Sequence, residues 1–463
     1  MRTKTTTLLC AAMVAAVLAG PAGALAANST WQNVGTDFNT TSNWNAGVPG
    51  GGNIATFDVA AVTNPNLSTS LSIGQLNFST AAAGGYTVSA SAGQALTLTT
   101  TTAITSSNTS GTNTISTPLT LTSGTRNFLQ APGGTLNVTG DITESGGAVT
   151  LTLNRTASGG HTITLSGNNN YTGGTNLSGA GGKLNIGSAT AIGTGTLAMG
   201  TSSHTVDNTS GGDMTLNNAL ALNNSSFTFS GSSSMTMNGA LTFGGTPASY
   251  SVTVSSNTLT LNGAMSGGSG RTITKLGAGT LALGGGNTTT GPMVVTAGTL
   301  LVNGDHSAAT GNVTVNSNAT LGGTGIVGGA TTINGKLSAG NSPGTLTFNA
   351  SLTLANGSTA IFEAGDLVNV GGALTLTDNW TLALGVGFVD GGSVTLFNYG
   401  SLTASPDLVP TFNITNLGFT PSGTLSLTDT GSSIVLNGVH VIPEPASMAL
   451  LAMGGLMMVK RRR

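Results

Sequence analysis

Short runs in which apolar residues alternate with threonine recur along the chain, and each run ends in a turn signal. The segments 214–220, 235–241 and 259–265 share this pattern, which recurs at intervals of slightly more than about 20 residues. The segments 313–316 and 331–335 repeat it at a slightly shorter interval. Alternation with a period of two predicts strands with one buried face. The Asn-Gly and Asn-Asn pairs that follow tolerate positive φ, so they predict tight turns between the strands.

Repeats of about 20 residues made of short strands and glycine turns favour a solenoid. In such a coil the apolar side chains point inward and stack on those of the next rung, and the threonines line the outer surface. At this period, about 410 residues would form roughly 20 rungs. A meander of antiparallel hairpins is the alternative, and the nearly constant interval between the turns favours the solenoid.

The composition agrees with an all-β fold. Of 463 residues, 12 are Lys or Arg, 14 are Asp or Glu, and 72 are glycine. Helices need more charge and fewer glycines, whereas Thr, Ser and Asn suit strands and turns. The 38% of hydrophobic residues favours a folded core over a disordered polymer. Residues 28–440 carry 13 acidic and 6 basic side chains, so no nucleic-acid partner is expected.

Residues 1–27 are predicted to be a secretory signal peptide. Arg2 and Lys4 provide the positive start, and an apolar run follows. Ala24 and Ala26 provide the small residues that signal peptidase requires, so cleavage is expected directly after this pair or one residue later. The single cysteine lies inside this segment, ahead of most of the apolar run, which argues against lipid attachment. The mature chain is therefore expected to have no disulfide.

The C-terminal segment 441–463 contains three parts in order. An apolar run over 446–459 separates two polar motifs, which are Pro443-Glu444-Pro445 and Lys460-Arg461-Arg462-Arg463. The run of 14 residues would span about 21 Å as a helix, which is short of the roughly 30 Å hydrocarbon core. An ordinary membrane anchor with a positive-inside tail is therefore the weaker interpretation.

Together, these three parts resemble the PEP-CTERM sorting signal, which also carries the label of an ice-binding protein C-terminal domain. The resemblance implies a C-terminal sorting helix that is held transiently in the inner membrane and recognised by an exosortase-type transpeptidase. It further implies that the chain reaches the cell surface, outer membrane or extracellular matrix of a Gram-negative bacterium.

Two internal regions resemble a second family. The similarity is to the autotransporter-associated β-strand repeat. The first region comprises residues 274–283 together with 296–302, and the second comprises residues 166–175. This resemblance implies a right-handed parallel β-helix of the kind displayed on cell surfaces. We therefore predict an all-β fold, a right-handed parallel β-helix or β-solenoid.

These observations divide the chain into five segments. The expected order is a signal peptide (1–27), an N-terminal cap (28–58), a β-solenoid with the repeats (59–362), terminal β rungs or a cap (363–440), and the sorting signal (441–463). Aromatic residues in the second segment are expected to cover the first rung, and an exposed ligand platform is the alternative.

Two glycine-rich motifs mimic catalytic or cofactor loops. Residues 323–328 fit G-x-G-x-x-G, but no helix is predicted after them, as a dinucleotide site requires. Residues 340–344 fit G-x-S-x-G, but a strand is predicted to follow where a nucleophile elbow needs a helix. Both motifs are therefore predicted to be solenoid turns.

Titratable side chains are few and scattered. His161, His204, His306 and His440 have no recurring acidic partners, so neither a metal site nor a catalytic triad is expected. Carboxylate pairs of the kind used by glycan-cleaving β-helices would be Asp141 with Glu144, or Glu363 with Asp366. Solvated turn acids are the preferred interpretation of both pairs.

Three functions are compatible with these features. The first is a non-enzymatic structural or adhesive protein of the surface or matrix, with exopolysaccharide or neighbouring surface proteins as partners. The second is a protein that binds an ice or polysaccharide lattice through ranks of threonine, although single Thr-Leu alternation needs only strand propensity. The third is a β-helix enzyme acting on polysaccharides. We expect the first function, with no catalytic residue, cofactor or metal.

Overall fold

The computed structural model describes residues 28–61, 63–82, 85–179, 181–223, 226–268, 270–340, 343–404, 410–417 and 420–441. The predicted signal peptide, with Ala24 and Ala26, lies outside the described residues. The predicted sorting signal is also outside them from residue 442 onward, which includes Pro443, Glu444, Pro445, Lys460, Arg461, Arg462 and Arg463.

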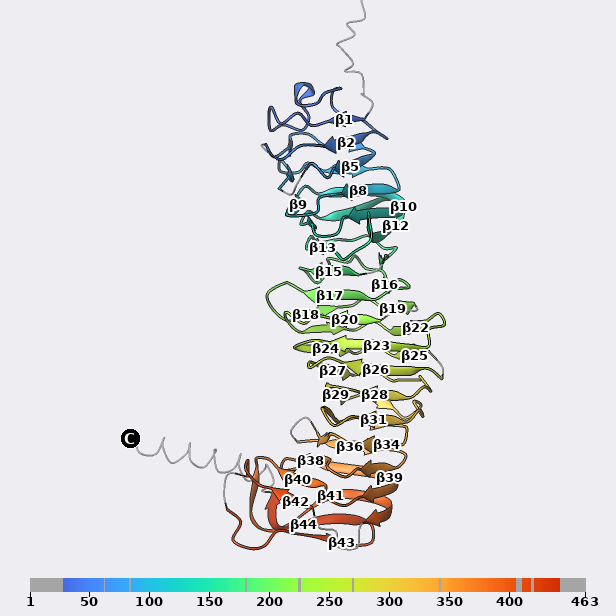
Figure 1. Cartoon of the computed structure of the whole chain (residues 1–463), viewed down its shortest axis with the longest axis vertical. Coiled ribbons are helices and arrows are strands. Elements are labelled where there is room, and N and C mark those ends of the chain that lie inside the picture. The colour runs from blue at the N-terminus through green and yellow to red at the C-terminus, as the bar shows by residue number, and fades with distance from the viewer. Residues whose placement is uncertain are drawn as a thin grey trace, which may run out of the picture.

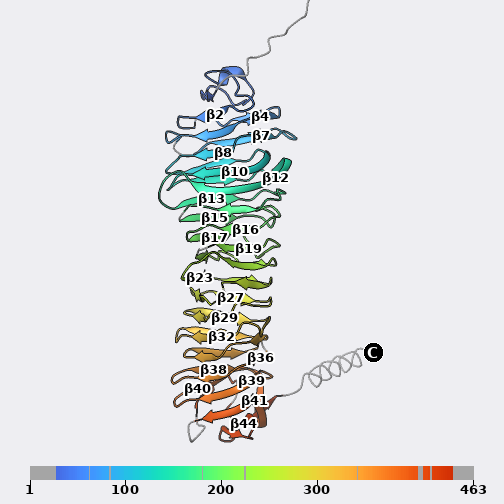
Figure 2. The same cartoon turned by 90° about the vertical axis from the view of Figure 1, so that its right-hand side faces the viewer.

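The chain winds into an elongated stack of β coils, with the N-terminal coils at one end and the C-terminal strands at the other (Figures 1 and 2). It forms a parallel β-solenoid of about 15 turns with almost no helix. The predicted all-β parallel solenoid is confirmed, and the antiparallel meander is wrong for the coils. The larger number of rungs expected from the sequence is also wrong. Coil length varies, since Thr320 pairs with Lys336 but Thr381 pairs with Thr411, and most coils are longer than the assumed repeat.

Parallel ladders run along the stack in three groups of strands. The first is a 13-stranded sheet comprising β1 (Ser29–Thr30), β2 (Ile54–Phe57), β4 (Leu71–Ile73), β5 (Gln75–Phe78), β7 (Leu96–Leu98), β8 (Thr102–Ser106), β10 (Leu119–Gln130), β12 (Ile142–Arg155), β14 (Thr175–Leu177), β16 (Leu197–Met199), β19 (Leu220–Asn223), β22 (Leu241–Gly244) and β25 (Met265–Gly267). The second is a 10-stranded sheet comprising β18 (Met214–Leu216), β21 (Met235–Met237), β24 (Thr258–Leu261), β27 (Thr280–Leu283), β29 (Gly298–Val302), β32 (Ala319–Gly323), β35 (Lys336–Ala339), β38 (Thr359–Phe362), β40 (Thr381–Leu384) and β42 (Thr411–Asn413).

The third group contains the remaining strands, and its ladders join at β39. Its members are β3 (Asn66–Leu67), β6 (Thr87–Ala90), β9 (Thr112–Ile115), β11 (Thr135–Val138), β13 (His161–Leu165), β15 (Gly182–Ile186), β17 (His204–Asn208), β20 (Phe227–Phe229), β23 (Ser249–Val254), β26 (Thr272–Leu276), β28 (Met293–Val295), β30 (Asp305–His306), β31 (Val313–Val315), β33 (Ile326–Val327), β34 (Thr331–Ile333), β36 (Thr345–Phe348), β37 (Leu352–Leu354), β39 (Leu367–Leu376), β41 (Phe388–Ala404), β43 (Ser426–Asp429) and β44 (Ser433–Val441). A short 3-10 helix, η1 (Thr41–Asn43), lies near the N-terminal end.

The sequence repeats correspond to strand pairing between coils. Met214 pairs with Met235, and Met235 pairs with Leu259, which reproduces the intervals seen in the sequence. Val313 pairs with Thr331, as the shorter interval predicted. Inward and outward positions alternate along these strands, so apolar side chains are buried and threonines face outward. Stacking of identical positions therefore builds one continuous core, which no single coil has alone.

Glycines stack in the turns that follow β21 and β24, and they correct the predicted role of the Asn-Gly pairs. Gly239 and Gly263 do not have positive φ. A Cβ on Gly263 would lie 2.0 Å from the carbonyl oxygen of Gly239, and a Cβ on Gly285 would lie 2.1 Å from that of Gly263. Glycine is needed here because successive turns approach closely, not because of backbone handedness.

The asparagines of the same turns form an amide ladder. Asn262 donates from Nδ2 to Oδ1 of Asn238 over 3.0 Å, and Asn238 donates to Oδ1 of Asn217 over 2.9 Å. The middle amide, that of Asn238, thus serves as both donor and acceptor along the direction of stacking. The ladder links three coils on an exposed corner.

The variant Gly263→Ala should destabilise the solenoid by about 1–3 kcal/mol, because the new methyl group overpacks against a backbone oxygen. Urea unfolding monitored by circular dichroism measures this loss. Gly212→Ala is the matched control, since a Cβ there would meet nothing within 4 Å, and its effect should stay within about 0.5 kcal/mol. Equal stability of the two variants would contradict the stacking argument.

An aromatic cluster closes the N-terminal end of the core. The ring centroids of Trp31 and Trp44 are 5.1 Å apart, and those of Phe38 and Trp44 are 4.8 Å apart. Phe57 continues the cluster onto Phe78 of a later coil, at 4.8 Å. Each of these five rings is at most 4% exposed. The aromatics therefore cover the first coil, and they do not form an exposed ligand platform.

The C-terminal end changes from parallel to antiparallel pairing. Parallel coils continue past Glu363, since β38 pairs with β40 and β40 with β42. Strand β41 then pairs in parallel with β39 and antiparallel with β44, and β43 is antiparallel to β44. This antiparallel unit covers the last coil (Figure 1).

Candidate functional site

A face of polar side chains covers the outer surface of β9, β11, β13, β15 and β17. Its first column consists of residues that pair in register from coil to coil, namely Thr112, Thr135, Thr162, Lys183 and Thr205. Thr228 and Thr253 extend the column over β20 and β23. Neighbouring members are separated by one coil, which is roughly 4.8 Å in a parallel sheet.

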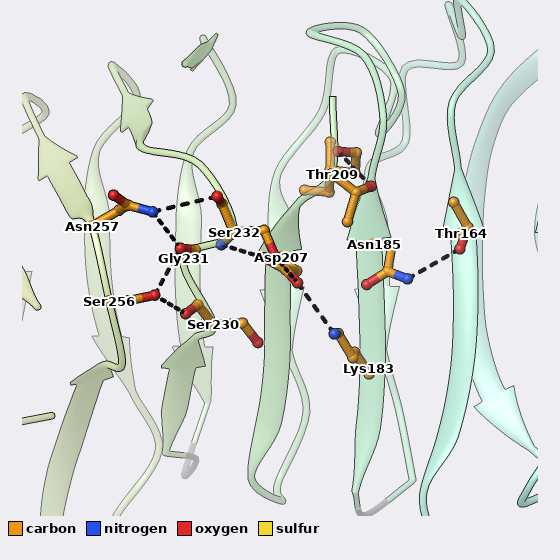
Figure 3. Close-up of polar contacts among 11 residues, drawn as sticks. Thr164, Lys183, Asn185, Asp207, Thr209, Ser230, Gly231, Ser232, Ser256 and Asn257 are labelled. Atoms are coloured by element: carbon orange, nitrogen blue, oxygen red, sulfur yellow. Dashed lines mark hydrogen bonds and ion pairs between the residues drawn. The ribbon is translucent and has the colours of Figure 1, made fainter. Parts of the chain in front are cut away.

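A second column runs beside the first, two residues further along each strand. It contains Thr114, Asn137, Thr164, Asn185 and Asp207, again in register. Asn185 donates from Nδ2 to Oγ1 of Thr164 over 3.2 Å (Figure 3). We call the two columns together the threonine–asparagine face.

An ion pair fixes the centre of this face. Nζ of Lys183 lies 3.1 Å from Oδ2 of Asp207. Asp207 is 2% exposed, and its carboxylate also accepts hydrogen bonds from the backbone N–H and hydroxyl of Ser232, over 3.0 and 2.9 Å (Figure 3). The nearly buried carboxylate is thus fully engaged in joining three coils, which explains why an acid is tolerated there.

The adjoining turn is held by side chains of the next coil. The Ser256 hydroxyl donates to the carbonyl oxygens of Ser230 and Gly231, and Nδ2 of Asn257 donates to Gly231 over 2.6 Å (Figure 3). Asn257 adopts positive φ, at 51°. These bonds tie the turn at the edge of the threonine–asparagine face to the next coil.

Two histidines face each other in the core beneath this face. His161 begins β13 and His204 begins β17, and the ring atoms of both lie around Gly182 of β15, which separates them in the stack. A Cβ on Gly182 would lie 2.9 Å from Nε2 of His161 and 3.4 Å from Nδ1 of His204. Glycine therefore makes room for both imidazoles.

The environment of this histidine pair is apolar. Nδ1 of His161 and both ring nitrogens of His204 are buried without a hydrogen-bond partner. Burial lowers the pKa of each imidazole to about 4, and the neighbouring His204 and Arg155 charges contribute for His161. The rings are therefore neutral at pH 7. In the sequence they are two isolated histidines, and their proximity becomes evident only once the register of the coils is known.

A buried lysine lies in the core within residues 274–283, one of the two regions that resemble the autotransporter-associated repeat. Lys275 of β26 is 1% exposed. Its three N–H groups are shared among four carbonyl oxygens, those of Leu276 (3.2 Å), Gly277 (2.7 Å), Gly279 (2.6 Å) and Ala297 (3.0 Å). Burial lowers the pKa of Lys275 to about 8. The ammonium therefore ties the turn after β26 to the next coil, and the sequence analysis missed this role.

The carboxylates of the first predicted pair, Asp141 and Glu144, bond to the backbone of turns. Glu144 accepts hydrogen bonds from the backbone N–H groups of Val149 (2.8 Å) and Thr172 (3.0 Å), and the bond from Thr172 is the main cause of its lowered pKa. Asp141 accepts from the backbone N–H of Asn168 over 2.7 Å. Both acids link neighbouring coils, so they are bonded turn residues.

The second pair, Glu363 and Asp366, is also tied to the backbone. Asp366 is 4% exposed and accepts from the N–H groups of Gly344 (2.9 Å) and Glu363 (2.8 Å). Burial raises the pKa of Asp366. The preferred interpretation as solvated turn acids is wrong for this residue, which is a buried acid of a turn.

The remaining candidates lie in separate places. His306 bonds through Nε2 to the carbonyl oxygen of Gly285 over 2.9 Å, and His440 bonds through Nδ1 to that of Gly391 over 2.6 Å. Residues 323–328 run from β32 directly into β33, a strand, as predicted. The G-x-S-x-G segment is followed by β36, also a strand, although its serine lies outside the described residues.

The described part of the chain has neither a metal-binding cluster nor a membrane helix. Its residues contain no group of three or more His, Cys, Asp or Glu side chains that could hold a metal ion. Across the same ranges, no helix has the length and apolar character needed to span a bilayer.

The fold and the face define a parallel β-solenoid with a regular polar surface, and parts of the chain are similar to known proteins. The Passenger-associated-transport-repeat family matches residues 156–185 and 273–302. These segments contain residues 166–175 and 274–283, which carried the resemblance to surface-displayed β-helices.

One curated relative matches part of the chain. The chain is 34% identical over 143 residues to the "Adhesin BmaC autotransporter" of Brucella suis biovar 1 (strain 1330). The alignment covers 27% of this chain and 4% of that protein. The chain thus spans a small fraction of the length of this relative.

Proposed function

We propose that the protein is an exported, non-enzymatic adhesive rod of the bacterial surface or exopolysaccharide matrix. The observation that carries this proposal is the threonine–asparagine face, in which two columns of polar side chains stay in register over successive coils. Such a face offers many weak hydrogen bonds over a long area, which suits an extended polymer or a neighbouring rod. The partial similarity to an adhesin supports the same function.

The proposal includes the route to the surface. Signal peptidase would remove residues 1–27, and an exosortase-type transpeptidase would process the tail near Pro443-Glu444-Pro445 after transient anchoring in the inner membrane. We also retain the right-handed winding, because crossovers between parallel strands are right-handed in about 98% of cases. The engagement of the candidate carboxylates in backbone bonds supports a function without catalysis.

Sorting is tested by expressing the full chain in its own host with an internal tag and determining the mature C-terminus by mass spectrometry. A chain that ends near Pro443 and is recovered from the surface or matrix is the expected result. An intact chain ending at Arg463 in the inner membrane would overturn the sorting proposal.

Adhesion is tested by retention of the exported protein on the exopolysaccharide of the same host. The triple variant Thr135→Asp, Thr162→Asp, Thr205→Asp adds three charges to the threonine–asparagine face and should lower retention by about tenfold or more, since it removes hydrogen-bonding hydroxyls and adds desolvation cost.

The matched control for adhesion places the same charges on another face. Thr215, Thr236 and Thr260 also stand in register, on β18, β21 and β24. Their triple Asp variant should bind like the wild type, and melting curves verify that both variants fold. Retention of both variants at the wild-type level would contradict an adhesive role for the threonine–asparagine face.

A lattice binder is the second candidate, and the register of the threonines favours it. Thr205, Thr228 and Thr253 follow one another on three coils, a regular array that could order water or match a crystalline polysaccharide. Lys183 interrupts the column, so the array is shorter than the rod. Thermal hysteresis in a freezing assay would support ice binding, and its absence would remove that candidate.

A further inference from the structure

An open groove lies at the C-terminal end of the solenoid, away from the threonine–asparagine face. It is about 450 Å³ in volume, within the range of roughly 300–1,000 Å³ that is typical of small-ligand sites. Three successive strands, β36, β39 and β41, supply its lining. The lining residues are Thr347, Phe348, Asn349, Asn369, Val370, Gly371, Asn398, Tyr399 and Gly400.

The groove coincides with an irregularity in the ladder between β39 and β41. Pairing is regular up to Val370 with Tyr399, and the register shifts before Ala373. Gly371 and Gly400 stack at this point, since a Cβ on Gly400 would lie 2.6 Å from the Gly371 oxygen. Bulges of this kind re-aim side chains and often adjoin binding sites. The glycines leave the backbone accessible on the floor of the groove.

A polar column from three coils forms one wall, because Thr347 pairs with Asn369 and Asn369 pairs with Asn398. Asn349 lies beside this column, next to Gly371. Asn398 donates from Nδ2 to Oδ1 of Asn369 over 2.9 Å and accepts from the Ser433 hydroxyl over 2.8 Å, so its amide orientation is fixed. This bond leaves the Nδ2 group of Asn369 directed elsewhere, and among the described residues it has no protein acceptor. Asn349 is exposed and its amide likewise has no side-chain bond within the described ranges. The wall thus offers preorganised donors and acceptors to a ligand.

The lining carries no charged side chain. Tyr399 is the ionisable member, and its hydroxyl is hydrogen-bonded to Asp429. Burial and this bond raise the pKa of Tyr399 to about 12, so the phenol remains neutral. A site without cations gives no reason to bind phosphates or acidic sugars. Its neutral amides match ligands rich in hydroxyl groups, because each amide both donates and accepts.

We propose that this groove binds a neutral glycan, whose hydroxyl groups bond to the amides of Asn349 and Asn369 while a sugar ring lies on the Gly371–Gly400 floor. Asn398 acts as a positioning residue for Asn369. The inference rests on the proposed matrix function for the class of partner, but it concerns a site separate from the threonine–asparagine face. It adds selectivity for one sugar type to the extended contact of that face.

The test is saturation-transfer NMR with the purified full chain and a panel of neutral hexasaccharides with glucose, mannose, galactose or xylose backbones. Hexagalacturonate is the acidic comparison. We expect binding to at least one neutral probe and none to the acidic one. Binding to no neutral probe, or to the acidic probe alone, would overturn the proposal.

Two variants locate the site for the bound probe. Asn369→Ala should weaken binding by about tenfold, as the loss of a directed hydrogen bond implies, and Thr347→Trp should abolish binding by filling the groove. Asn238→Ala, in the exposed amide ladder far along the rod, is the matched control and should stay within about twofold. Unchanged binding by both groove variants would place the glycan elsewhere. That outcome would not affect the adhesion proposal. Adhesion is tested separately, by the retention of threonine–asparagine face variants on the matrix.

Discussion

Replacing Lys275 by methionine should destabilise the solenoid by about 3 kcal/mol or more. The three N–H groups of the ammonium are shared among four carbonyl oxygens, and a buried carbonyl that loses its donor costs roughly 1–3 kcal/mol. Burial lowers the pKa of Lys275 to about 8, so most of the amine is still protonated at pH 7 and can donate. Methionine fills the space but cannot donate, so it leaves these carbonyl oxygens without their partner and lowers the stability of the fold.

Hydrogen exchange and urea unfolding of the Lys275→Met variant measure this effect. In a stack where each coil contacts only its neighbours, the loss should appear first as faster exchange within residues 273–302. Lys336→Met is the matched control, since Lys336 is exposed on β35, and its effect should stay within about 0.5 kcal/mol. A Lys275→Met variant as stable as this control would show that the four carbonyls do not need the ammonium.

Acidification from pH 7 to pH 4 should destabilise the coils around the buried histidine pair. The pKa of each ring is about 4 in the folded chain and about 6.5 when unfolded. The unfolded state therefore binds protons that the folded state excludes, so this contribution is present above pH 6.5 and decreases as the pH falls toward 4. Because the charge on one ring affects the other, the two shifts do not add, and the pair as a whole contributes on the order of a few kcal/mol.

Melting temperatures of the wild type and of the double variant His161→Leu, His204→Leu across this pH range test the prediction. The variant should retain more of its pH 7 stability at pH 4.5, because leucine fills the apolar site without binding a proton. The single variants should each recover part of the difference. Parallel pH profiles for the wild type and the double variant would mean that carboxylates alone cause the acid loss.

Much of the coil architecture follows from local sequence. The Thr-apolar alternation predicts which side chains are buried, and the recurrence of Met214, Met235 and Leu259 predicts their stacking. The number of coils was overestimated because loops and long strands vary in length. For example, β10 has 12 residues and β12 has 14. Coil length depends on how the turns pack against each other. The alternation of apolar residues and threonine within a strand gives no information about this packing.

The polar sites are built from residues of different coils. Their prediction was limited because the sequence alone does not show which coils are neighbours. Lys275 could have been found, since its separation of two residues from buried Ile273 places it on the inner face. The proximity of His161 and His204 around Gly182 is evident only from the register between distant strands. The same is true of the column that joins Thr347, Asn369 and Asn398. The predicted sorting signal and signal peptide remain predictions, because both lie outside the described residues.

The two differently built ends have a consequence for self-association. A stack of parallel strands would leave a row of unpaired N–H and C=O groups at each end, on which another stack could grow into a fibre. Here the aromatic cluster around Trp31 and Trp44 covers one end, and the antiparallel strands β43 and β44 cover the other. The two covered ends have different structures, which disfavours end-to-end stacking of identical rods by continued parallel pairing.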